Sequence, residues 1–415
     1  MIVGGLKKTT SRLAIAAAAG LFMGGTALAP AQAASLGGDC CADLEERVAE
    51  LEATTVRKGN RKVSVKLSGH VNRAILWWDD GHDSDSHYVD GGVTRTRFRI
   101  TGNATISPGR TAGFHIENDW HISNIASATS NCMSGPTSGT ACMSYANPSD
   151  RSTTRKAEIW IKDERLGKVS LGKGDMASNG SSEVDLSSTT VLSYSGMSDW
   201  GGGYWFRTSA GFFGTQVGTA WNNLDGDTRQ DRIRYDTPSL GGFTFSTSHR
   251  RDVIDFAVRF KKEWNSVRCA AAAAWLHNTT NKDDFDYEQF SSSASCIHTP
   301  SGVNLTVAYA EREWNNNPDQ FLRFDTDFYF VKLGIARRWN SHGKTAISIS
   351  YGETSDTVSL GDDVNAWGVD FVQFIDSAAL ELFAGYRVFE YDDKIQSTLS
   401  YEEMDHFIAG ARMKF

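Results

Sequence analysis

The sequence lacks the features that mark a helical membrane protein, a nucleic-acid-binding protein or a common enzyme. After the first 30 residues, no hydrophobic run reaches the roughly 20 residues that a membrane-spanning helix needs. The formal net charge of −8 argues against nucleic acid as a partner. The ten histidines form no His-x-x-x-His pair, and no Gly-x-Ser-x-Gly elbow is present. We therefore expect neither catalysis nor a cofactor, and no metal site.

Proline is scarce too, with 7 residues against 39 glycines, which suits many strands joined by tight turns. From Val63 onward the hydrophobic period is two, as in RFRITGNATI from Arg97 to Ile106. The final stretch, HFIAGARMKF from His406 to Phe415, alternates in the same way. Such a strand has one apolar face. It would leave an open edge in water unless it paired with the first strand and closed a barrel.

The N-terminus has the pattern of a secretory signal. Lys7, Lys8 and Arg12 precede an apolar run of small residues that ends in Ala31-Gln32-Ala33, so we expect export and cleavage after Ala33. A membrane anchor is the alternative. Residues 34–61 contain Leu44, Val48 and Leu51 at coiled-coil spacing. This segment is either a solvated helix or a small helical bundle in an oligomer, followed by a basic linker.

We expect about sixteen strands between residues 62 and 415; Tyr287–His298 is the weakest of them, and fourteen or eighteen strands are the alternatives. The lengths of the connections favour a membrane barrel over a soluble sandwich. Even-numbered connections are short, and odd-numbered ones are mostly long and polar, as in outer-membrane barrels with short periplasmic turns and longer external loops. This parity places both chain ends in the periplasm. The expected strands are Lys62–Trp77, Thr94–Ile106, Arg110–Trp120, Thr153–Asp163, Gly167–Gly174, Arg229–Asp236, Gly242–Arg251, Val253–Lys262, Val267–Asn278, Tyr287–His298, Val303–Glu313, Asp327–Arg338, Lys344–Glu353, Asp363–Ile375, Ala378–Glu390 and Met404–Phe415.

Tryptophans and the terminal Phe415 collect toward strand ends, as interfacial aromatic girdles would. These include Trp77-Trp78, Trp120, Trp264, Trp314 and Trp339. Ordinary strand aromatics are the alternative. Six cysteines are compatible with an oxidising periplasm. Cys132 and Cys142 lie in one polar loop and could close it. Cys269 and Cys296 fall on neighbouring strands and could pair across them, whereas the state of Cys40 and Cys41 stays open.

The fifth connection, Asp175 to Thr228, is by far the longest, and long irregular stretches are usually functional or disordered. It contains Glu183, Asp185 and Asp199. Folded into the barrel, it would narrow the lumen to a constriction; lying outside, it would only cap the lumen.

The chain resembles the general bacterial outer-membrane porins, particularly the alphaproteobacterial type. The resemblance rests on GKVSLGKGD (Gly167–Asp175), on RIRYDTPSLGGFTFSTS (Arg232–Ser248) and on the C-terminal HFIAGARMKF. It extends over most of Val63 to Phe415. The resemblance implies a sixteen-stranded all-β transmembrane antiparallel barrel, usually trimeric. It also implies a third external loop bent inward opposite a basic wall.

The polar faces of the strands supply a candidate basic wall: Lys66, Arg97, Arg99, Arg232 and Arg234. The candidate acidic partners in or beside the long connection are Asp175, Glu183 and Asp185. Opposed charges of this kind set up a field across a narrow pore and sort solutes by size and charge. Alternatively, the arginines pair with carboxylates on neighbouring strands and only rigidify the wall.

The leading hypothesis is an outer-membrane porin of a Gram-negative bacterium, through which small hydrophilic solutes and ions diffuse passively. Lipopolysaccharide and other outer-membrane lipid would surround a homotrimer. A substrate-selective channel for sugars or small anions is the alternative within transport, and Trp200, Tyr204 and Trp205 in the long connection hint at one. A closed structural or adhesive barrel is a further alternative. Asp79, Asp80, Asp83 and Asp85 could bind a divalent cation loosely.

Overall fold

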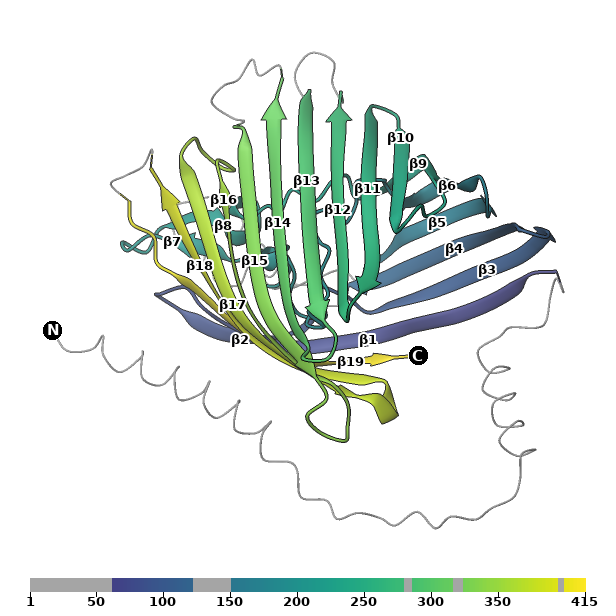
Figure 1. Cartoon of the computed structure of the whole chain (residues 1–415). Helices are drawn as coiled ribbons and strands as arrows, with labels where there is room; N and C mark the ends of the chain where they lie inside the picture. The colour runs from purple at the N-terminus through teal and green to yellow at the C-terminus, as the bar shows by residue number, and fades with distance from the viewer. Residues whose placement is uncertain (1–61, 122–150, 280–285, 316–323, 395–398) are drawn as a thin grey trace, which may run out of the picture. The chain divides into compact units, whose positions relative to one another are not determined.

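The computed structural model describes residues 62–121, 151–279, 286–315, 324–394 and 399–415 (Figure 1). The expected signal sequence at 1–33 and the segment at 34–61 lie outside these ranges. So do Cys40, Cys41, Cys132 and Cys142.

Most of the described strands form one closed antiparallel ring. Three of the nineteen, β2 (Ser84–Asp90), β7 (Trp205–Arg207) and β8 (Phe213–Gln216), lie outside the ring, which leaves sixteen. The expected antiparallel barrel and all sixteen expected strands are confirmed. In ring order they are β1 (Ser64–Asp79), β3 (Arg97–Ser107), β4 (Arg110–His121), β5 (Arg151–Asp163), β6 (Gly167–Asp175), β9 (Arg229–Asp236), β10 (Phe243–Arg250), β11 (Val253–Trp264), β12 (Val267–Asn278), β13 (Tyr287–His298), β14 (Val303–Trp314), β15 (Thr326–Arg337), β16 (Thr345–Ser355), β17 (Asp362–Ile375), β18 (Leu380–Asp393) and β19 (Met404–Lys414).

The ring closes where β19 pairs with β1, and the two strands lie side by side in Figure 1. Trp77 lies opposite Phe407, and Trp78 opposite His406. Beyond the ladder, the Gly69 amide donates to the Phe415 carbonyl at 2.8 Å, and the Phe415 amide returns a bond of 3.0 Å to the Gly69 carbonyl. The seam therefore leaves the final strand without an open edge.

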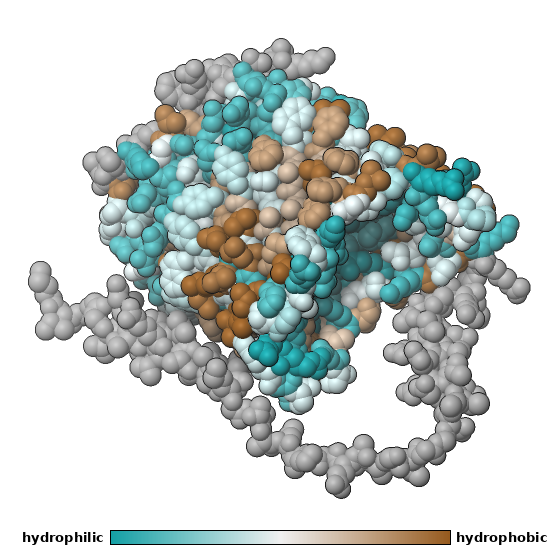
Figure 2. Space-filling view, viewed as in Figure 1, coloured by the Kyte–Doolittle hydropathy of each residue, from teal (hydrophilic) through white to brown (hydrophobic). Residues whose placement is uncertain are grey.

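The outer face of the ring is apolar. Leu67, Val71 and Ile75 on β1 are 43%, 50% and 49% exposed, whereas the alternate residues Ala74 and Leu76 are buried. Figure 2 shows hydrophobic side chains gathered on the outer wall, with hydrophilic residues above and below them. In a membrane barrel the exposed apolar face meets lipid.

Tryptophans near strand ends do reach the surface in part. Trp120, Trp264 and Trp339 are about half exposed, as an aromatic girdle requires. Trp78 differs from the expectation, because it is only 2% exposed and its ring lies 5.1 Å from that of Tyr204. It faces the interior and packs against the long connection.

Short connections are concentrated at one end of the ring. Between β11 and β12, Asn265 and Ser266 have φ values of 48° and 65°, the left-handed pair that a two-residue hairpin turn requires. The long connections emerge at the opposite end, which we call the long-loop end. Arg251, between β10 and β11, belongs to a short turn at that end.

The long connections contain structure of their own. β2 pairs with the second half of β1, whereas β3 pairs with the first half. The connection between β6 and β9 contains a short 3-10 helix, η2 (Met197–Asp199), the β7–β8 hairpin and one turn of α-helix, α3 (Val217–Ala220). A second 3-10 turn, η3 (Asp376–Ala378), lies between β17 and β18. Among the described residues, no helix has the length and apolar character needed to cross a membrane.

Candidate functional site: the constriction of the barrel

The connection between β6 and β9, which we call the constriction loop, folds into the barrel and follows its inner wall. It begins against β10 and β11, where the Ala177 amide donates to Ser248 Oγ at 2.7 Å. The amide of Ser178 and its hydroxyl donate to Asp255 Oδ2 at 2.8 and 2.6 Å. Asp255 is fully buried, so the wall satisfies the loop's first polar groups.

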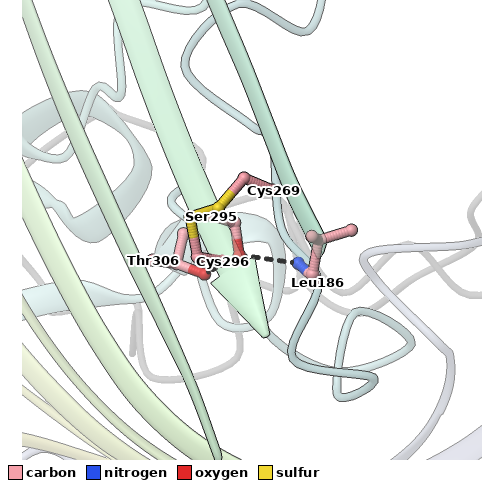
Figure 3. Close-up of a disulfide and its surroundings, with 5 residues drawn as sticks. All are labelled: Leu186, Cys269, Ser295, Cys296 and Thr306. Carbon is pink, nitrogen blue, oxygen red and sulfur yellow. Dashed lines mark hydrogen bonds between the residues drawn. A yellow bond between two sulfur atoms is a disulfide. The ribbon is translucent and has the colours of Figure 1, made fainter. Parts of the chain in front are cut away.

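Alternate serines of β13 also form hydrogen bonds with the constriction loop. Ser291, Ser293 and Ser295 face inward and are buried. Ser293 Oγ accepts from the Val184 amide at 2.9 Å and donates to the Ser181 carbonyl at 2.6 Å. Ser295 Oγ accepts from the Leu186 amide at 2.9 Å (Figure 3). Small hydroxyl side chains let the loop backbone approach the wall closely and still satisfy its hydrogen bonds.

The outward neighbours on the same strands include a disulfide. Cys269 and Cys296 lie directly opposite each other on β12 and β13, and their sulfur atoms are bonded (Figure 3). The disulfide links two strands whose inner faces support the constriction loop.

Further along, a buried lysine on β15 fixes the loop. Lys332 is fully buried, and its Nζ lies 2.9 Å from Asp185 Oδ2 and 2.8 Å from the Ser193 carbonyl. The Asp185 side chain is only 2% exposed. Asp185, proposed from the sequence as an acidic residue of the constriction, therefore pairs with the wall instead of facing open space.

The loop next crosses β18 and the seam. Arg387 on β18 is fully buried, donates to the Met197 carbonyl and places its guanidinium 4.1 Å from the ring centre of Trp200. Tyr204 packs against His406 on β19, with ring centres 5.3 Å apart. Trp200 and Tyr204 are buried, so they hold the loop to the wall and do not line a permeation path.

The β7–β8 hairpin is tied to the first connection of the barrel. Arg207 Nε lies 2.9 Å from Asp80 Oδ2, and Arg207 Nη2 lies 2.9 Å from Asp83 Oδ2. A guanidinium thus pairs with two of the four acidic residues, Asp80 and Asp83, that the sequence suggested for a divalent cation. Within the described ranges, no group of three or more His, Cys, Asp or Glu side chains is arranged to hold a metal.

Between the loop and the opposite wall, a cavity of about 670 Å³ remains open. Arginines line it on the wall side and carboxylates on the loop side. The arginines are Arg95, Arg97, Arg155 and Arg229, and the carboxylates are Glu183, Asp199 and Asp225. A solute in this space would pass between charges of opposite sign.

The arginines of the wall are fixed by buried carboxylates. Glu117 on β4 accepts from Arg155 Nε at 2.7 Å and from Arg97 Nη1 at 3.4 Å, and it also pairs with Arg99. Asp119 lies directly opposite Arg97 in the ladder and 3.4 Å from Arg155. Several guanidinium groups therefore share few carboxylates, which keeps them extended and in place.

Amide groups, and not arginines of the wall, donate hydrogen bonds to two carboxylates of the loop. Asp225 accepts from the Gly180 amide at 2.8 Å and the Ser182 amide at 3.1 Å, and Glu183 accepts from Asn223 Nδ2 at 3.2 Å. Burial raises the pKa of Glu183 well above its ordinary value, and the charges of Asp225 and Asp199 raise it further. Burial also raises the pKa of Asp225 and that of Asp199. The acidic side of the constriction therefore loses charge at a higher pH than exposed carboxylates do.

The remaining residues proposed from the sequence lie outside the cavity lining. Arg232 pairs with Glu158, and Arg234 pairs with Asp236 at 2.7 Å. These two residues follow the alternative in which arginines rigidify the wall. Asp175 pairs with Lys156 and Arg229 where the constriction loop begins, and Lys66 is exposed near the start of β1. Of the proposed residues, only Arg97 and Glu183 line the cavity. Arg99 follows Arg97 on the same face of β3.

Four charged residues of the lining could not be, or were not, predicted from the sequence: Arg95, Arg155, Asp225 and Arg229. Arg95 has the same parity as Arg97 and Arg99, so the alternation could have found it. Arg155 lies at a register shift between β4 and β5, which breaks the alternation that would have marked it. Asp225 lies near the end of the loop, where no periodic signal exists. Arg229 begins β9 at the parity of the outward Ile233 and Tyr235, so the alternation assigns it to the outer face.

A closed antiparallel ring with an apolar outer face, and a charged constriction made by its own loop, defines an outer-membrane channel. The sequence matches the model of the Gram-negative porins over residues 14–394, and the chain belongs to that family. It is an outer-membrane porin.

Several solved structures share the fold of this chain at low sequence identity. An anion-selective porin from Comamonas acidovorans has a TM-score of 0.57 and 13% identity, covering 85% of this chain and 100% of that one. OprB of Pseudomonas putida has a TM-score of 0.59 and 10% identity, covering 90% and 97%. OmpT of Vibrio cholerae, in a trimer form, has a TM-score of 0.53 and 13% identity, covering 85% and 99%. No curated protein matches the sequence.

Proposed function

We propose that this porin is a passive diffusion channel for small hydrophilic solutes and ions, and that the charges of its constriction decide which solutes pass. The observation that carries the proposal is the cavity between the arginine wall and the loop carboxylates. Opposed charges across a narrow aqueous path orient water and polar solutes, and they exclude apolar ones. Such a channel needs no site that binds a solute tightly.

The signal-like N-terminus supports export through the periplasm, with the long-loop end facing the outside. The trimer form of OmpT, a protein of the same fold, supports a homotrimer for this chain. Lipopolysaccharide and outer-membrane phospholipid are the lipids that the apolar outer face would meet.

Selection by stacked aromatic rings within the constriction is less favoured, because Trp200 and Tyr204 are buried and Trp205 does not line that cavity. A closed structural barrel is less favoured because the cavity remains open between loop and wall.

Planar-bilayer recording of the purified, signal-cleaved protein tests the proposal. We expect ohmic steps in KCl that appear in groups of three, and a reversal potential in a salt gradient that changes sign or size when constriction charges are removed. The matched variants are Asp225→Asn, which removes one charge from the lining, and Asp236→Asn, which removes one from outside it. Stable insertion without conductance would contradict a diffusion channel.

A further inference from the structure

A second cavity, of about 500 Å³, lies at the long-loop end and shares no lining residue with the constriction. Its walls come from the β7–β8 hairpin, from Val358 in the connection between β16 and β17, and from the end of β18. Leu399 and Tyr401, which precede β19, complete it. Its volume falls within the range of about 300–1,000 Å³ typical of small-molecule sites.

The walls of this cavity are fixed by backbone bonds. The Ser209 amide donates to the Ser400 carbonyl at 2.9 Å, and the Glu402 amide donates to the Arg207 carbonyl at 2.7 Å. The segment before β19 thus pairs with the hairpin. Tyr401 packs so closely over Gly214 that a Cβ there would lie 2.3 Å from the Tyr401 ring. The cavity is therefore formed before any ligand arrives.

Aromatic rings make up much of the surface. Trp205, Phe213 and Tyr401 line the cavity, together with Tyr391. Tyr391 lies between two other rings, with its centre 5.3 Å from that of Phe206 and 5.0 Å from that of Tyr401. Flat aromatic surfaces of this kind accept the C–H face of a sugar ring, because such a face is apolar and lies flat.

The polar groups among the lining residues are uncharged, with one exception. They are the amide of Gln216 and the hydroxyls of Thr208, Thr215, Thr219, Tyr391 and Tyr401, and the exception is Asp393. Asp393 is 8% exposed and accepts from Ser359 Oγ at 3.3 Å. Among the described residues, the lining includes no lysine or arginine. The Arg207 guanidinium, 4.4 Å from the ring centre of Phe213, is paired with Asp80 and Asp83, so an anion in the cavity would meet a carboxylate. Hydroxyl groups of a neutral ligand, by contrast, can donate to the carboxylate and bond the amide.

We propose that this cavity binds a pyranose ring of a neutral saccharide at the mouth of the channel. The inference rests on the proposed function, because it gives the channel a solute class that it concentrates at its entrance. An organic ammonium ion is the competing ligand, since aromatic rings and a carboxylate also attract cations.

The test uses the full-length mature protein in detergent, with maltose as the probe and tryptophan fluorescence as the readout. The variants are Trp205→Phe, which shrinks the stacking surface, and Gln216→Ala, which removes a hydrogen-bonding amide. Trp275→Phe is the matched control, because Trp275 is partly exposed on the outer face of β12. KCl conductance in a planar bilayer is recorded for every variant, and choline chloride is titrated in parallel.

We expect a saturable maltose response that Gln216→Ala weakens about fivefold, the usual effect of one lost hydrogen bond, and that Trp275→Phe leaves unchanged. Normal KCl conductance with no saturable response, or with a response that both cavity variants retain, would overturn the saccharide site and leave the channel intact. A choline response stronger than the maltose response, and abolished by Asp393→Asn, would assign the cavity to cations instead. Absent KCl conductance would contradict the proposed function itself.

Discussion

The constriction loop packs against one part of the barrel wall and stands away from the opposite part. From β10 to β19 the inner face carries serines, alanines, buried aromatic rings such as Phe328 and Phe389, and a few buried ions, and the loop packs directly onto it. From β3 to β5 the inner face carries arginines, and the cavity stays open in front of them. One wall therefore serves as a support for the loop, and the other serves as the charged surface that solutes meet.

The difference lies in how many charged side chains each wall carries. Serines such as Ser293 supply both a donor and an acceptor to the loop backbone, and the buried Lys332 is paired with Asp185 of the loop. Arg97 and Arg155 belong to a cluster of cations, and desolvating several of them together against a loop would be costly. The loop therefore packs on the less charged wall, and the pore forms on the arginine side. The following predictions test this division.

Lys332→Met should have the largest effect on the supporting wall. It leaves the Asp185 carboxylate buried without its cation, which costs about 3–5 kcal/mol. We expect a lower resistance of the folded protein to urea and a noisier open channel, because the loop loses its central attachment. The double variant Lys332→Met with Asp185→Leu should recover most of the lost free energy of unfolding. If the double variant is as unstable as the single one, the ion pair is not what holds the loop.

At the constriction, Arg95→Gln on one side and Asp225→Asn on the other should change selectivity in opposite directions. Two charges about 4 Å apart in water interact by about 1 kcal/mol, which corresponds to roughly a fivefold change in the permeability ratio. Arg95→Gln should favour cations, and Asp225→Asn should favour anions. The measurement is the reversal potential in a KCl gradient. Shifts of the same sign in both variants would show that the two sides do not act as opposed charges.

Lowering the pH should move the channel toward anions. Because the pKa of Glu183 is raised by burial and by Asp225 and Asp199, the loop loses negative charge at a pH where exposed carboxylates are still ionised. Arginines keep their charge throughout this range. We expect the reversal potential to move toward the anion value as the pH falls from 8 to 5, and to move less in Glu183→Gln. An equal response in wild type and variant would assign the titration to other groups.

The smallest effect should come from single serines on β13. Ser293→Ala removes both bonds to the loop, at Val184 and Ser181, and should cost about 1–2 kcal/mol in the free energy of unfolding. Ser292→Ala is the control, because Ser292 lies on the outer face and bonds only the Tyr309 carbonyl of the next strand. Urea unfolding of the refolded protein measures both. A larger loss in Ser292→Ala would mean that the barrel wall, and not the loop, dominates the transition.

The ring of strands could be predicted from the sequence because its signals are local. A period of two and the residues of tight turns are visible within about ten residues, so β9, β12 and β13 begin and end where the sequence places them. The path of the constriction loop depends instead on distant partners. Asp185 and Asp225 are the same residue type in the same loop. Asp185 is withdrawn from the pore by Lys332, 147 residues away, and nothing in the local sequence distinguishes the two.

Arg155 illustrates a second reason why residues of the constriction could not be predicted from the sequence. Alternation assigns a residue to one face only while the register is regular, and the shift between Glu117 and Asn118 interrupts it. Irregularities of this kind are common next to functional sites, so the residues that matter most at the constriction are those that a periodic pattern describes least well.

The position of Tyr204 has a consequence for how the barrel assembles. Trp78 and His406 face each other across the seam, and Tyr204 packs on both rings, at 5.1 and 5.3 Å. Without Tyr204, the side chains of Trp78 and His406 would be exposed to the lumen at the seam. In the folded barrel, one side chain of the constriction loop therefore touches both strands of the seam. Closure of the wall and narrowing of the pore share this contact, so a change at Tyr204 would affect both.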